Sequence, residues 1–366
     1  MIKEIIVIIP AYKPSEGLIS FVDKLMNFYD KILIVDDGSG LEYEKVFDTF
    51  NDKKFNQKVF VFKHIKNMGK GRAQKDAINY SFNIFKEEIE NNEIKGFASV
   101  DADGQHDIND IINCSNVFLK NQESLVLGQR EFKKDVPLRS KLGNLITIKI
   151  MQILHNINLQ DTQTGLRVFG IENAKKYLSL VGEGYEFETN MLISSKKENI
   201  PLLEVPINTI YIDDNSSSHF DTIRDSFKIY KVILFDFVKY SCSSLFTFFI
   251  DISLFQIFFS FIRNIFGVTD IHIYLATVFS RIISSTFNYN INKKLVFKQK
   301  SKKSVISYFS LVVINMMISA YLVNMVSKYY FHHSIVLIKI LIDTILYVVN
   351  FIIQKQFIFK KRGDTQ

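Results

Sequence analysis

Residues 96–106 read Gly-Phe-Ala-Ser-Val-Asp-Ala-Asp-Gly-Gln-His. The first five are small or apolar and indicate a short buried strand, which leads directly into two aspartates, Asp101 and Asp103. Two carboxylates one residue apart can reach one hard divalent cation if the chain turns after them, and Gly104 permits such a turn. The stretch therefore predicts a strand that ends in a candidate Mg²⁺ or Mn²⁺ site, although a solvated acidic turn has the same pattern.

Similar apolar runs recur through the first 130 residues and alternate with stretches of helical spacing such as 18–29 and 70–89. Strands that are buried on both faces and separated by helices form a mainly parallel sheet. Such sheets bind ligands beyond the carboxyl ends of their strands, and polar motifs stand at those positions here. The predicted strands are 4–10, 31–37, 58–64, 96–103 and 124–130, and the motifs include Pro10-Ala11-Tyr12, Asp36-Asp37-Gly38-Ser39 and Gly128-Gln129-Arg130.

The sequence lacks the motifs of dinucleotide-dependent dehydrogenases and of P-loop ATPases. The dinucleotide fingerprint G-x-G-x-x-G is absent from the first turn, and the chain has no G-x-x-x-x-G-K-[ST] phosphate loop. Residues 67–72 (Asn-Met-Gly-Lys-Gly-Arg) permit two interpretations, a Gly-rich helix start or a backbone nest with a cation near a diphosphate. The two cysteines, Cys114 and Cys242, are too few and too far apart for a disulfide framework or a cysteine zinc site.

The composition changes near Lys231. All five prolines precede this residue, no glutamate follows it, and the basic residues of the remainder separate long apolar runs. Each run has close to the ~20 residues that a helix needs to cross a bilayer, so we expect four membrane spans. Because lysines crowd the connection after the second run and the end of the fourth, the positive-inside rule places residues 1–230 and the C-terminus in the cytoplasm. The predicted spans are about 241–262, 271–292, 304–327 and 335–354.

The apolar half also contains a repeat. FNYNINKKLVFK at 287–298 matches VNFIIQKQFIFK at 349–360, which predicts two helical hairpins that end in the same basic-aromatic anchor; chance convergence on an interfacial pattern is the alternative. Charges within the spans are costly in lipid and are expected to pair for packing, or else to form a path for a sugar headgroup. These charges are Asp251, Arg281, Lys339 and Asp343.

Two further segments, 137–157 and 220–240, combine apolar and basic residues at helical spacing. Helices of this composition can lie in the membrane interface with their cations toward the headgroups. Ordinary amphipathic packing against the sheet gives the same pattern, so both interpretations stay open.

Seven motifs follow one another over about 200 residues: VIIPAYKP, ILIVDDGS, NMGKGRA, VDADGQH, LGQR, DTQTGLRVF and GYEFETNML. Together they resemble the family 2 glycosyltransferases of GT-A fold, most specifically the dolichyl-phosphate mannosyltransferase and bactoprenol glucosyltransferase branch. The second half resembles the GtrA family of four-helix membrane proteins. The resemblance implies an α/β GT-A cytosolic domain (Rossmann-like, with a mainly parallel sheet) at 1–216, an amphipathic juxtamembrane helix at 217–240 and an all-α four-helix transmembrane domain at 241–366.

The resemblance also implies a nucleotide site, a metal site and a set of phosphate-binding arginines. The nucleotide site comprises Pro10, Ala11, Tyr12, Asp37, Lys70 and Asp101. The ligands of a Mg²⁺ or Mn²⁺ ion are Asp101, Asp103 and Gln105. The arginines, for phosphates of donor or acceptor, are Arg130, Arg139 and Arg167. His106 is expected to be solvated or hydrogen-bonded rather than a metal ligand.

The expected reaction moves a hexose, mannose slightly ahead of glucose, from GDP-mannose or UDP-glucose to polyprenyl (dolichyl or undecaprenyl) phosphate with inversion. A phosphate nucleophile is already an anion and needs no general base. One alternative is a flippase or transporter of lipid-linked sugar, and another is a transferase to a glycan or protein hydroxyl with Glu186 or Glu188 as base. Processive synthases carry a Q-x-x-R-W pattern, which a chain without Trp cannot have. We expect a multi-pass protein of the plasma membrane with no nucleic-acid partner, and predict no oligomeric state.

Overall fold

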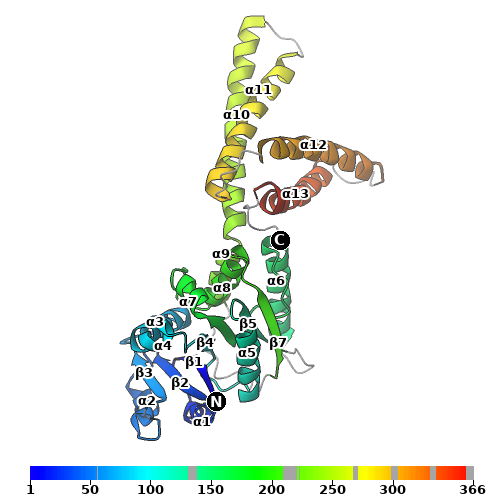
Figure 1. Cartoon of the computed structure of the whole chain (residues 1–366). Coiled ribbons are helices and arrows are strands. Elements are labelled where there is room, and N and C mark those ends of the chain that lie inside the picture. Colours follow the sequence, from blue (N-terminus) through cyan, green and yellow to red (C-terminus); the bar gives the residue numbers. More distant parts are fainter. Residues whose placement is uncertain are drawn as a thin grey trace. The chain divides into compact units, whose positions relative to one another are not determined.

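The computed structural model describes residues 1–55, 57–130, 138–208, 221, 223–266, 271–297, 304–329 and 335–359. The chain forms two compact units, Met1–Ile233 and Leu234–Gln366. In Figure 1 the first unit runs from blue to green and the second from yellow-green to red. The predicted boundary between residues 216 and 217 lies outside the described residues.

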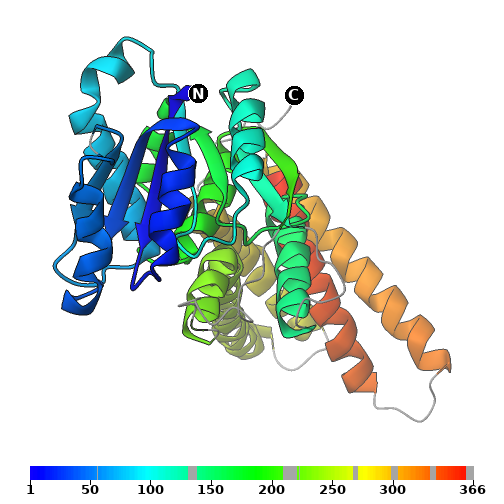
Figure 2. The same ribbon diagram turned by 90° about the horizontal axis from the view of Figure 1, so that it is seen from below.

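A mixed sheet forms the centre of the first unit, with seven strands in the described part of the chain (Figures 1 and 2). The order is β3-β2-β1-β4-β6-β5-β7, and all neighbours are parallel except where β6 pairs with β4 and β5. The prediction of a mainly parallel sheet is therefore confirmed. The strands are β1 (Ile2–Ala11), β2 (Tyr29–Asp36), β3 (Val59–Lys63), β4 (Gly96–Ser99), β5 (Leu125–Arg130), β6 (Arg167–Gly170) and β7 (Leu202–Ile207).

Strands β6 and β7 add to the five that the apolar runs predicted. β6 is only four residues long, and Pro206 interrupts the pattern of β7, so neither gives a clear strand signal. Because β6 runs against its neighbours, the loop that precedes it reaches the edge of the sheet where the parallel strands end. This reversal brings the motif at 161–167 to the carboxyl ends of β4 and β5.

Helices cover both faces of the sheet (Figure 2). Alternate residues of β1, Ile5, Val7 and Ile9, share a core with α1 and α5, while α3 contacts β1 and β2 from the other face. A strand packed on both faces needs apolar side chains at every position, which is why β1 reads as a continuous apolar run. The helices are α1 (Gly17–Leu25), η1 (Leu41–Tyr43), α2 (Glu44–Asp48), η2 (Thr49–Asn51), α3 (Lys70–Ile84), α4 (Lys86–Glu90), α5 (Ile108–Lys120), α6 (Leu138–His155), α7 (Ile171–Leu178), α8 (Glu186–Lys197) and α9 (Arg224–Ile233).

The two amphipathic segments form α6 and α9, which pack together in the first unit. The hydroxyls of Thr147 and Tyr230 lie 3.2 Å apart, and the His155 ring hydrogen-bonds the Ile233 carbonyl oxygen at 2.9 Å. Ile223 and Phe227 stay 80% and 71% exposed beside α9 and on it. The two helices thus pack on each other, as ordinary amphipathic packing predicts, and also leave apolar side chains exposed; a position in the membrane interface stays a prediction. Leu234 separates α9 from the next helix, so segment 220–240 is not one continuous helix.

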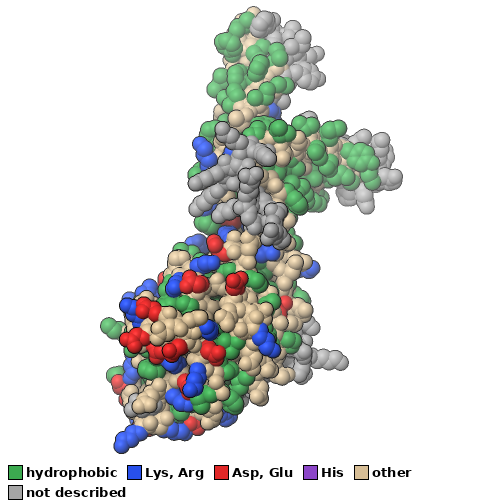
Figure 3. Space-filling model, viewed as in Figure 1, with side chains coloured by type: hydrophobic (Ala, Val, Ile, Leu, Met, Phe, Trp, Pro, Cys, Tyr) green, Lys and Arg blue, Asp and Glu red, His purple; other side chains and the backbone are tan. Residues whose placement is uncertain are grey.

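The second unit is helical at each of the four predicted spans. Within its described residues, Phe235–Ile265 and Leu341–Ile358 are long and apolar enough to cross a membrane. Figure 3 shows many hydrophobic side chains on the visible face of the second unit, whereas acidic and basic side chains are spread over the first unit. Exposed apolar surface on this scale suits a lipid environment. The helices are α10 (Phe235–Phe266), α11 (Ile271–Ile291), η4 (Asn292–Val296), α12 (Ser304–Tyr329), α13 (Ile335–Ile353) and η5 (Gln354–Ile358).

The sequence repeat is also a structural repeat. η4 and η5 are π-helical turns at equivalent positions, each closed by a 2.8 Å hydrogen bond, from Phe297 N to Asn292 O and from Phe359 N to Gln354 O. The equivalent side chains contact each other, because Asn292 Nδ2 donates to Gln354 Oε1 at 3.3 Å. The Phe297 and Phe359 rings stack with centroids 5.0 Å apart. The two hairpins therefore meet through their matching ends.

The charged residues of the predicted spans have polar partners where their side chains are described. Asp251 accepts a hydrogen bond from Ser284 at 2.7 Å and lies 3.4 Å from Arg281 Nε, which confirms the pairing across α10 and α11. Asp343 accepts a hydrogen bond from Ser319 of α12. The side chain of Lys339 lies outside the described residues.

Candidate active site

A cavity of about 570 Å³ opens at the carboxyl ends of β1, β2 and β4. This size suits a small-molecule ligand. It brings together residues that the sequence analysis selected from four separate motifs, and it adds residues from the starts of α8 and α9. The predicted residues that line it are Pro10, Ala11, Tyr12, Asp37, Lys70, Asp101 and Asp103; Tyr185, Asp225 and Lys228 are among the additions.

Lys70, the first residue of α3, is the central cation of this cavity. Its Nζ lies 2.6 Å from Asp101 Oδ1 and 2.8 Å from Glu188 Oε1, and 5.4 Å from the centre of the Tyr185 ring. Burial alone would lower the pKa of Lys70, but the two carboxylates raise it above its usual value. The ammonium therefore stays charged and links the end of β4 to α8.

Asp37 organises the turn that presents Lys70. Its Oδ1 accepts hydrogen bonds from Met68 N at 2.8 Å and from the His64 ring at 2.7 Å, and its Oδ2 accepts one from Gly69 N at 2.8 Å. Two backbone donors of the turn, Met68 N and Gly69 N, are thus occupied by a carboxylate of the protein. A helix does start here, at Lys70, and Lys70 lines the cavity.

The glycines near the cavity mark close approaches of backbone. Gly69 has a φ of +101°, and a Cβ there would lie 2.4 Å from the Glu183 carbonyl oxygen. A Cβ at Gly165 would lie 2.0 Å from Asp101 Oδ2, which no real contact tolerates. Gly165, in the loop before β6, therefore helps to set the position of the Asp101 carboxylate.

The predicted metal ligands stand together at the end of β4, where Asp103 Oδ1 accepts a hydrogen bond from Gln105 N at 3.0 Å. Burial raises the pKa of Asp103, and the nearby Asp101 carboxylate raises it further. Burial would also raise the pKa of Asp101, but Lys70 and His106 hold it well below its usual range. His106 is buried rather than solvated, and its Nε2 lies 3.5 Å from Asp101 Oδ2 without making a hydrogen bond to it.

The negative charges of Asp101 and Asp103 repel each other, and a cation bound between the two carboxylates would relieve this repulsion. The donors are all oxygen, which suits Mg²⁺ or Mn²⁺. Among the described residues, no three His, Cys, Asp or Glu side chains converge into a complete ligand set. The site therefore fits a hard ion held by two carboxylates, with further ligands from water or from a bound diphosphate.

The three predicted arginines differ in their positions. Arg130, at the end of β5, makes a bidentate ion pair with the fully buried Asp161, at 2.6 and 3.0 Å. Arg167 is fully buried on β6, where Nη1 donates to the Glu188 carbonyl oxygen at 2.6 Å and Nε to the Thr164 carbonyl oxygen at 3.1 Å. In this position Arg167 reaches no surface at which a phosphate could bind. Arg139 lies in the first turn of α6, where side chains are outside the described residues.

Sequence reasoning did not single out Asp161, the buried partner of Arg130, although it begins the motif DTQTGLRVF. It considered Glu188 only as a possible base, yet Glu188 is buried and engaged by Lys70 and by Gln74 Nε2 at 3.1 Å. Spacing alone cannot show such a partnership, because the two residues stand more than a hundred positions apart in the chain.

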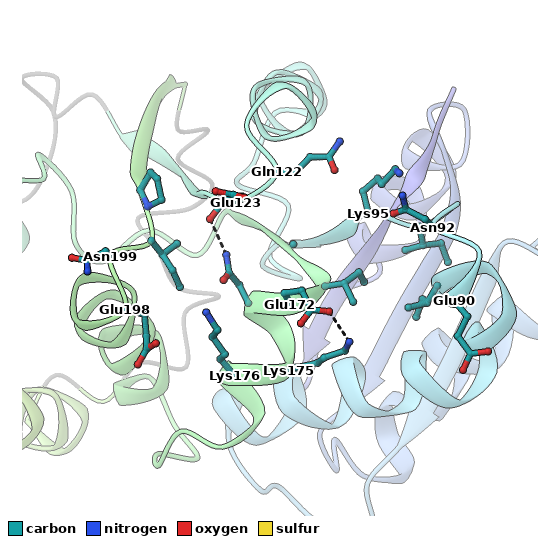
Figure 4. Close-up of a pocket in the computed structure, with 17 residues that line it drawn as sticks. Glu90, Asn92, Lys95, Gln122, Glu123, Glu172, Lys175, Lys176, Glu198 and Asn199 are labelled. Carbon is teal, nitrogen blue, oxygen red and sulfur yellow. Dashed lines mark hydrogen bonds and ion pairs between the residues drawn. The ribbon is translucent and has the colours of Figure 1, made fainter. Parts of the chain in front are cut away.

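A second, larger groove of about 680 Å³ lies at the opposite edge of the sheet (Figure 4). It is formed at the amino ends of β4 and β7, with Lys95, Glu123 and Glu198 among its lining residues. Glu172 and Lys175 pair on its rim at 2.6 Å. None of the predicted site residues lines this groove.

Comparison with known proteins agrees with this architecture. Residues 6–177 match the family described as glycosyl transferase family 2, and residues 236–359 match the GtrA/DPMS transmembrane domain. The chain is 34% identical over 250 residues to a UDP-N-acetylglucosamine–dolichyl-phosphate N-acetylglucosaminyltransferase of Methanococcus voltae, an alignment that covers 63% of this chain and 95% of that protein. It is 29% identical over 237 residues to a dolichyl-phosphate beta-glucosyltransferase of Dictyostelium discoideum, covering 59% and 69% of the two chains.

Among solved structures, a mannosyl-3-phosphoglycerate synthase from Rubrobacter xylanophilus aligns with a TM-score of 0.44 at 16% identity, over 63% of this chain and 72% of that one. A mainly parallel α/β sheet with charged residues at the carboxyl ends of its strands, in a chain that also matches the GtrA/DPMS transmembrane domain, defines the class. The chain belongs to glycosyl transferase family 2 and is a glycosyltransferase.

Proposed function

We propose that this protein transfers a sugar from a nucleotide sugar to a polyprenyl phosphate in the membrane, with inversion at the anomeric carbon. Two relatives are named for transfer to dolichyl phosphate, and the chain carries a domain of the GtrA/DPMS type. The observation that carries the proposal is the cavity itself, which combines a carboxylate pair for a metal with an ammonium at the edge where nucleotide ligands bind.

The state of the acidic residues favours a phosphate acceptor over a hydroxyl acceptor. A hydroxyl needs a base to remove its proton, whereas a phosphate is already ionised. Glu188 is held by Lys70, and Glu186 Oε1 accepts hydrogen bonds from Glu183 N at 3.1 Å and Gly184 N at 3.2 Å. Both glutamates that could have been the base are therefore engaged in structure.

The residues of the cavity divide the remaining work. Asp101 and Asp103 would hold the cation, with Gln105 beside them, and a divalent ion there would neutralise charge on the departing nucleoside diphosphate. Lys70 adds a positive charge on the same side. Lys228 of α9 also lines the cavity and supplies a cation near the apolar face that a lipid acceptor would follow. Alignment of two reactants and stabilisation of the leaving group are then the main sources of catalysis.

The fold does not identify the donor sugar; the label-transfer experiment described below, with several nucleotide sugars, identifies it. The sequence analysis placed GDP-mannose slightly ahead of UDP-glucose, and the two relatives are named for N-acetylglucosamine and glucose. All three nucleotide sugars therefore belong in the test.

The second unit is proposed to cross the membrane four times, with the catalytic unit and the C-terminus in the cytoplasm of the cell. The lysines of the two repeat ends, Lys293 and Lys355 among them, support this orientation because basic residues concentrate on the cytoplasmic side. Cysteine labelling from either side of sealed vesicles would test it.

The experiment for the reaction is label transfer into the organic phase. Membranes containing the full chain are incubated with polyprenyl phosphate, Mn²⁺ and radioactive GDP-mannose, UDP-glucose or UDP-N-acetylglucosamine in turn. We expect lipid-extractable label from one donor, lost with EDTA and in Asp103→Ala. Absence of transfer from every donor by folded protein would contradict the polyprenyl-phosphate acceptor.

A further inference from the structure

Lys70 forms an ion pair with one of the two predicted metal ligands, Asp101. Its Nζ lies 2.6 Å from Asp101 Oδ1, one of the two carboxylates that fit a divalent cation. The other oxygen, Asp101 Oδ2, faces His106 at 3.5 Å and lies against Gly165. Oδ1 of Asp101 is therefore engaged by a cation of the protein, while the Asp101 side chain stays 28% exposed and lines the cavity.

A cation and an ammonium compete for one carboxylate oxygen. They repel each other at contact distance, and in a buried site that repulsion is poorly screened. The charge of Lys70, held at Oδ1, opposes a divalent ion on the same carboxylate. A divalent ion on Asp101 therefore favours movement of Lys70 away from Oδ1 toward another partner, because an unpaired ammonium in a buried site is costly.

Glu188 is the partner already in place. Its Oε1 lies 2.8 Å from Lys70 Nζ, and its side chain is buried at the start of α8. Two neighbours fix it: Gln74 Nε2 donates to the same oxygen at 3.1 Å, and Arg167 Nη1 donates to the Glu188 carbonyl oxygen at 2.6 Å. This is also a structural role for Arg167, which lies too deep for substrate.

The net charge of the side chains around Lys70 is consistent with a divalent cation replacing Lys70 at Asp101. Lys70 contributes one positive charge, and Asp101, Asp103 and Glu188 contribute three negative charges, so these four groups carry a formal charge of −2. One divalent cation balances that charge without expelling Lys70 from the cavity.

We propose that Lys70 is a resident counter-ion of Asp101 that yields this carboxylate to a divalent cation, and that Glu188 is the positioning residue that retains Lys70 in the cavity. The inference rests on the metal-dependent function proposed above and extends it. After the exchange, the Lys70 ammonium remains on the side of the cavity where donor phosphates bind. Glu188 thus acts through Lys70, and it is neither a base nor a metal ligand.

The test measures Mn²⁺ affinity of the purified full chain in detergent, from the free-Mn²⁺ signal in electron paramagnetic resonance, without any substrate. In Lys70→Met the competitor is gone, so we expect Mn²⁺ to bind about tenfold more tightly, a typical coupling between two sites. In Glu188→Gln, Lys70 depends on Asp101 alone, so we expect several-fold weaker binding. Lys75→Met is the matched control: it removes a buried ammonium from the same helix, one that pairs with Glu183 at 2.9 Å, and should leave Mn²⁺ affinity within about twofold.

The double variant Lys70→Met/Glu188→Gln tests whether Glu188 affects Mn²⁺ binding through Lys70 or only through its own negative charge. If Glu188 acts through Lys70, adding Glu188→Gln to Lys70→Met changes Mn²⁺ affinity by less than about twofold. If Glu188 acts only by its negative charge, the weakening is the same in both backgrounds, and the positioning role is wrong. The double variant removes one charge of each sign, which keeps the cluster balanced and the chain foldable if Lys70→Met alone does not fold.

The remaining outcomes distinguish this inference from the proposed function. Equal Mn²⁺ affinity in wild type and Lys70→Met would overturn the counter-ion role while leaving a metal-dependent transferase intact. No Mn²⁺ binding by any variant would overturn both. Tighter binding in Lys70→Met, in a protein that transfers no label to polyprenyl phosphate, would support the exchange and contradict the proposed acceptor.

Discussion

One cavity lies at the carboxyl ends of the parallel strands and a second at their amino ends, and the charged residues of the two differ in burial. At the carboxyl edge, Lys70, Asp101 and Asp37 are largely buried, and each is held by partners from other elements. At the amino edge the groove is larger, but its ion pair between Glu172 and Lys175 joins exposed neighbours on one helix (Figure 4). Buried charges are expensive and persist where they have a task. Cavity size therefore says less about function here than the cost of the charges inside.

The largest difference between the edges should appear when a carboxylate of the candidate metal pair is neutralised. We expect Asp103→Asn to reduce transfer by more than about 100-fold, because the isosteric amide keeps the shape but loses the charge that binds the cation. Initial rates of label transfer at saturating donor measure this. Asp107→Asn is the matched control: Asp107 caps α5 by accepting from Asn109 N at 2.7 Å, and asparagine caps equally well. Similar losses in both variants would remove the special role of Asp103.

A steric change at the same edge should have the next largest effect. In Gly165→Ala the new Cβ would lie 2.0 Å from Asp101 Oδ2, so the carboxylate or the loop before β6 has to shift. We expect transfer to fall by about 10- to 100-fold, since a displacement of about 1 Å at a reacting site costs that much. The paired measurement is thermal unfolding, which separates displacement of Asp101 from general instability.

Gly143→Ala provides the comparison, because a Cβ at this position in α6 meets nothing within 4 Å. Alanine is the better helix former by about 0.5–1 kcal/mol, so stability should rise slightly and transfer should stay the same. If Gly165→Ala were equally harmless, Asp101 would not depend on the approach of that loop.

A smaller loss is expected from the residue that holds Arg130. Asp161→Asn removes the charge that forms the bidentate ion pair and so weakens the hold on the guanidinium. If Arg130 contacts a phosphate, as the sequence predicts, the turnover number should fall about tenfold while the chain stays folded. Gln160→Ala, which removes only an exposed contact with Gln129 at 2.8 Å, should not change turnover. Unchanged kinetics in Asp161→Asn would assign the pair to stability instead.

The sequence predicted which residues lie together at the carboxyl ends of the parallel strands, because these residues directly follow strands that are recognisable as apolar runs. Asp37, Asp101 and Asp103 each come after an apolar run, and parallel strands bring such ends together. Glu188, Gly165 and Asp161 were not assigned their positions, because they arrive through an antiparallel strand and a helix start. Their contacts join residues far apart in sequence, and Lys70 to Glu188 is the clearest example. Arg167 was predicted to contact a phosphate but is fully buried. A strand residue next to the site can face the core, and the sequence does not show which side it faces.

The smallest effect is expected at the amino edge, and it tests whether the contrast between the edges is real. Lys175→Ala breaks an exposed pair between residues three positions apart on α7, worth about 0.2–0.5 kcal/mol of unfolding free energy. Transfer and Mn²⁺ affinity should both match wild type, because no predicted ligand or substrate contact lines this groove. Denaturant unfolding and label transfer on the same preparation check the two statements. A clear loss of transfer with unchanged stability would make the larger groove a second functional site, and burial of charge would no longer separate the two edges.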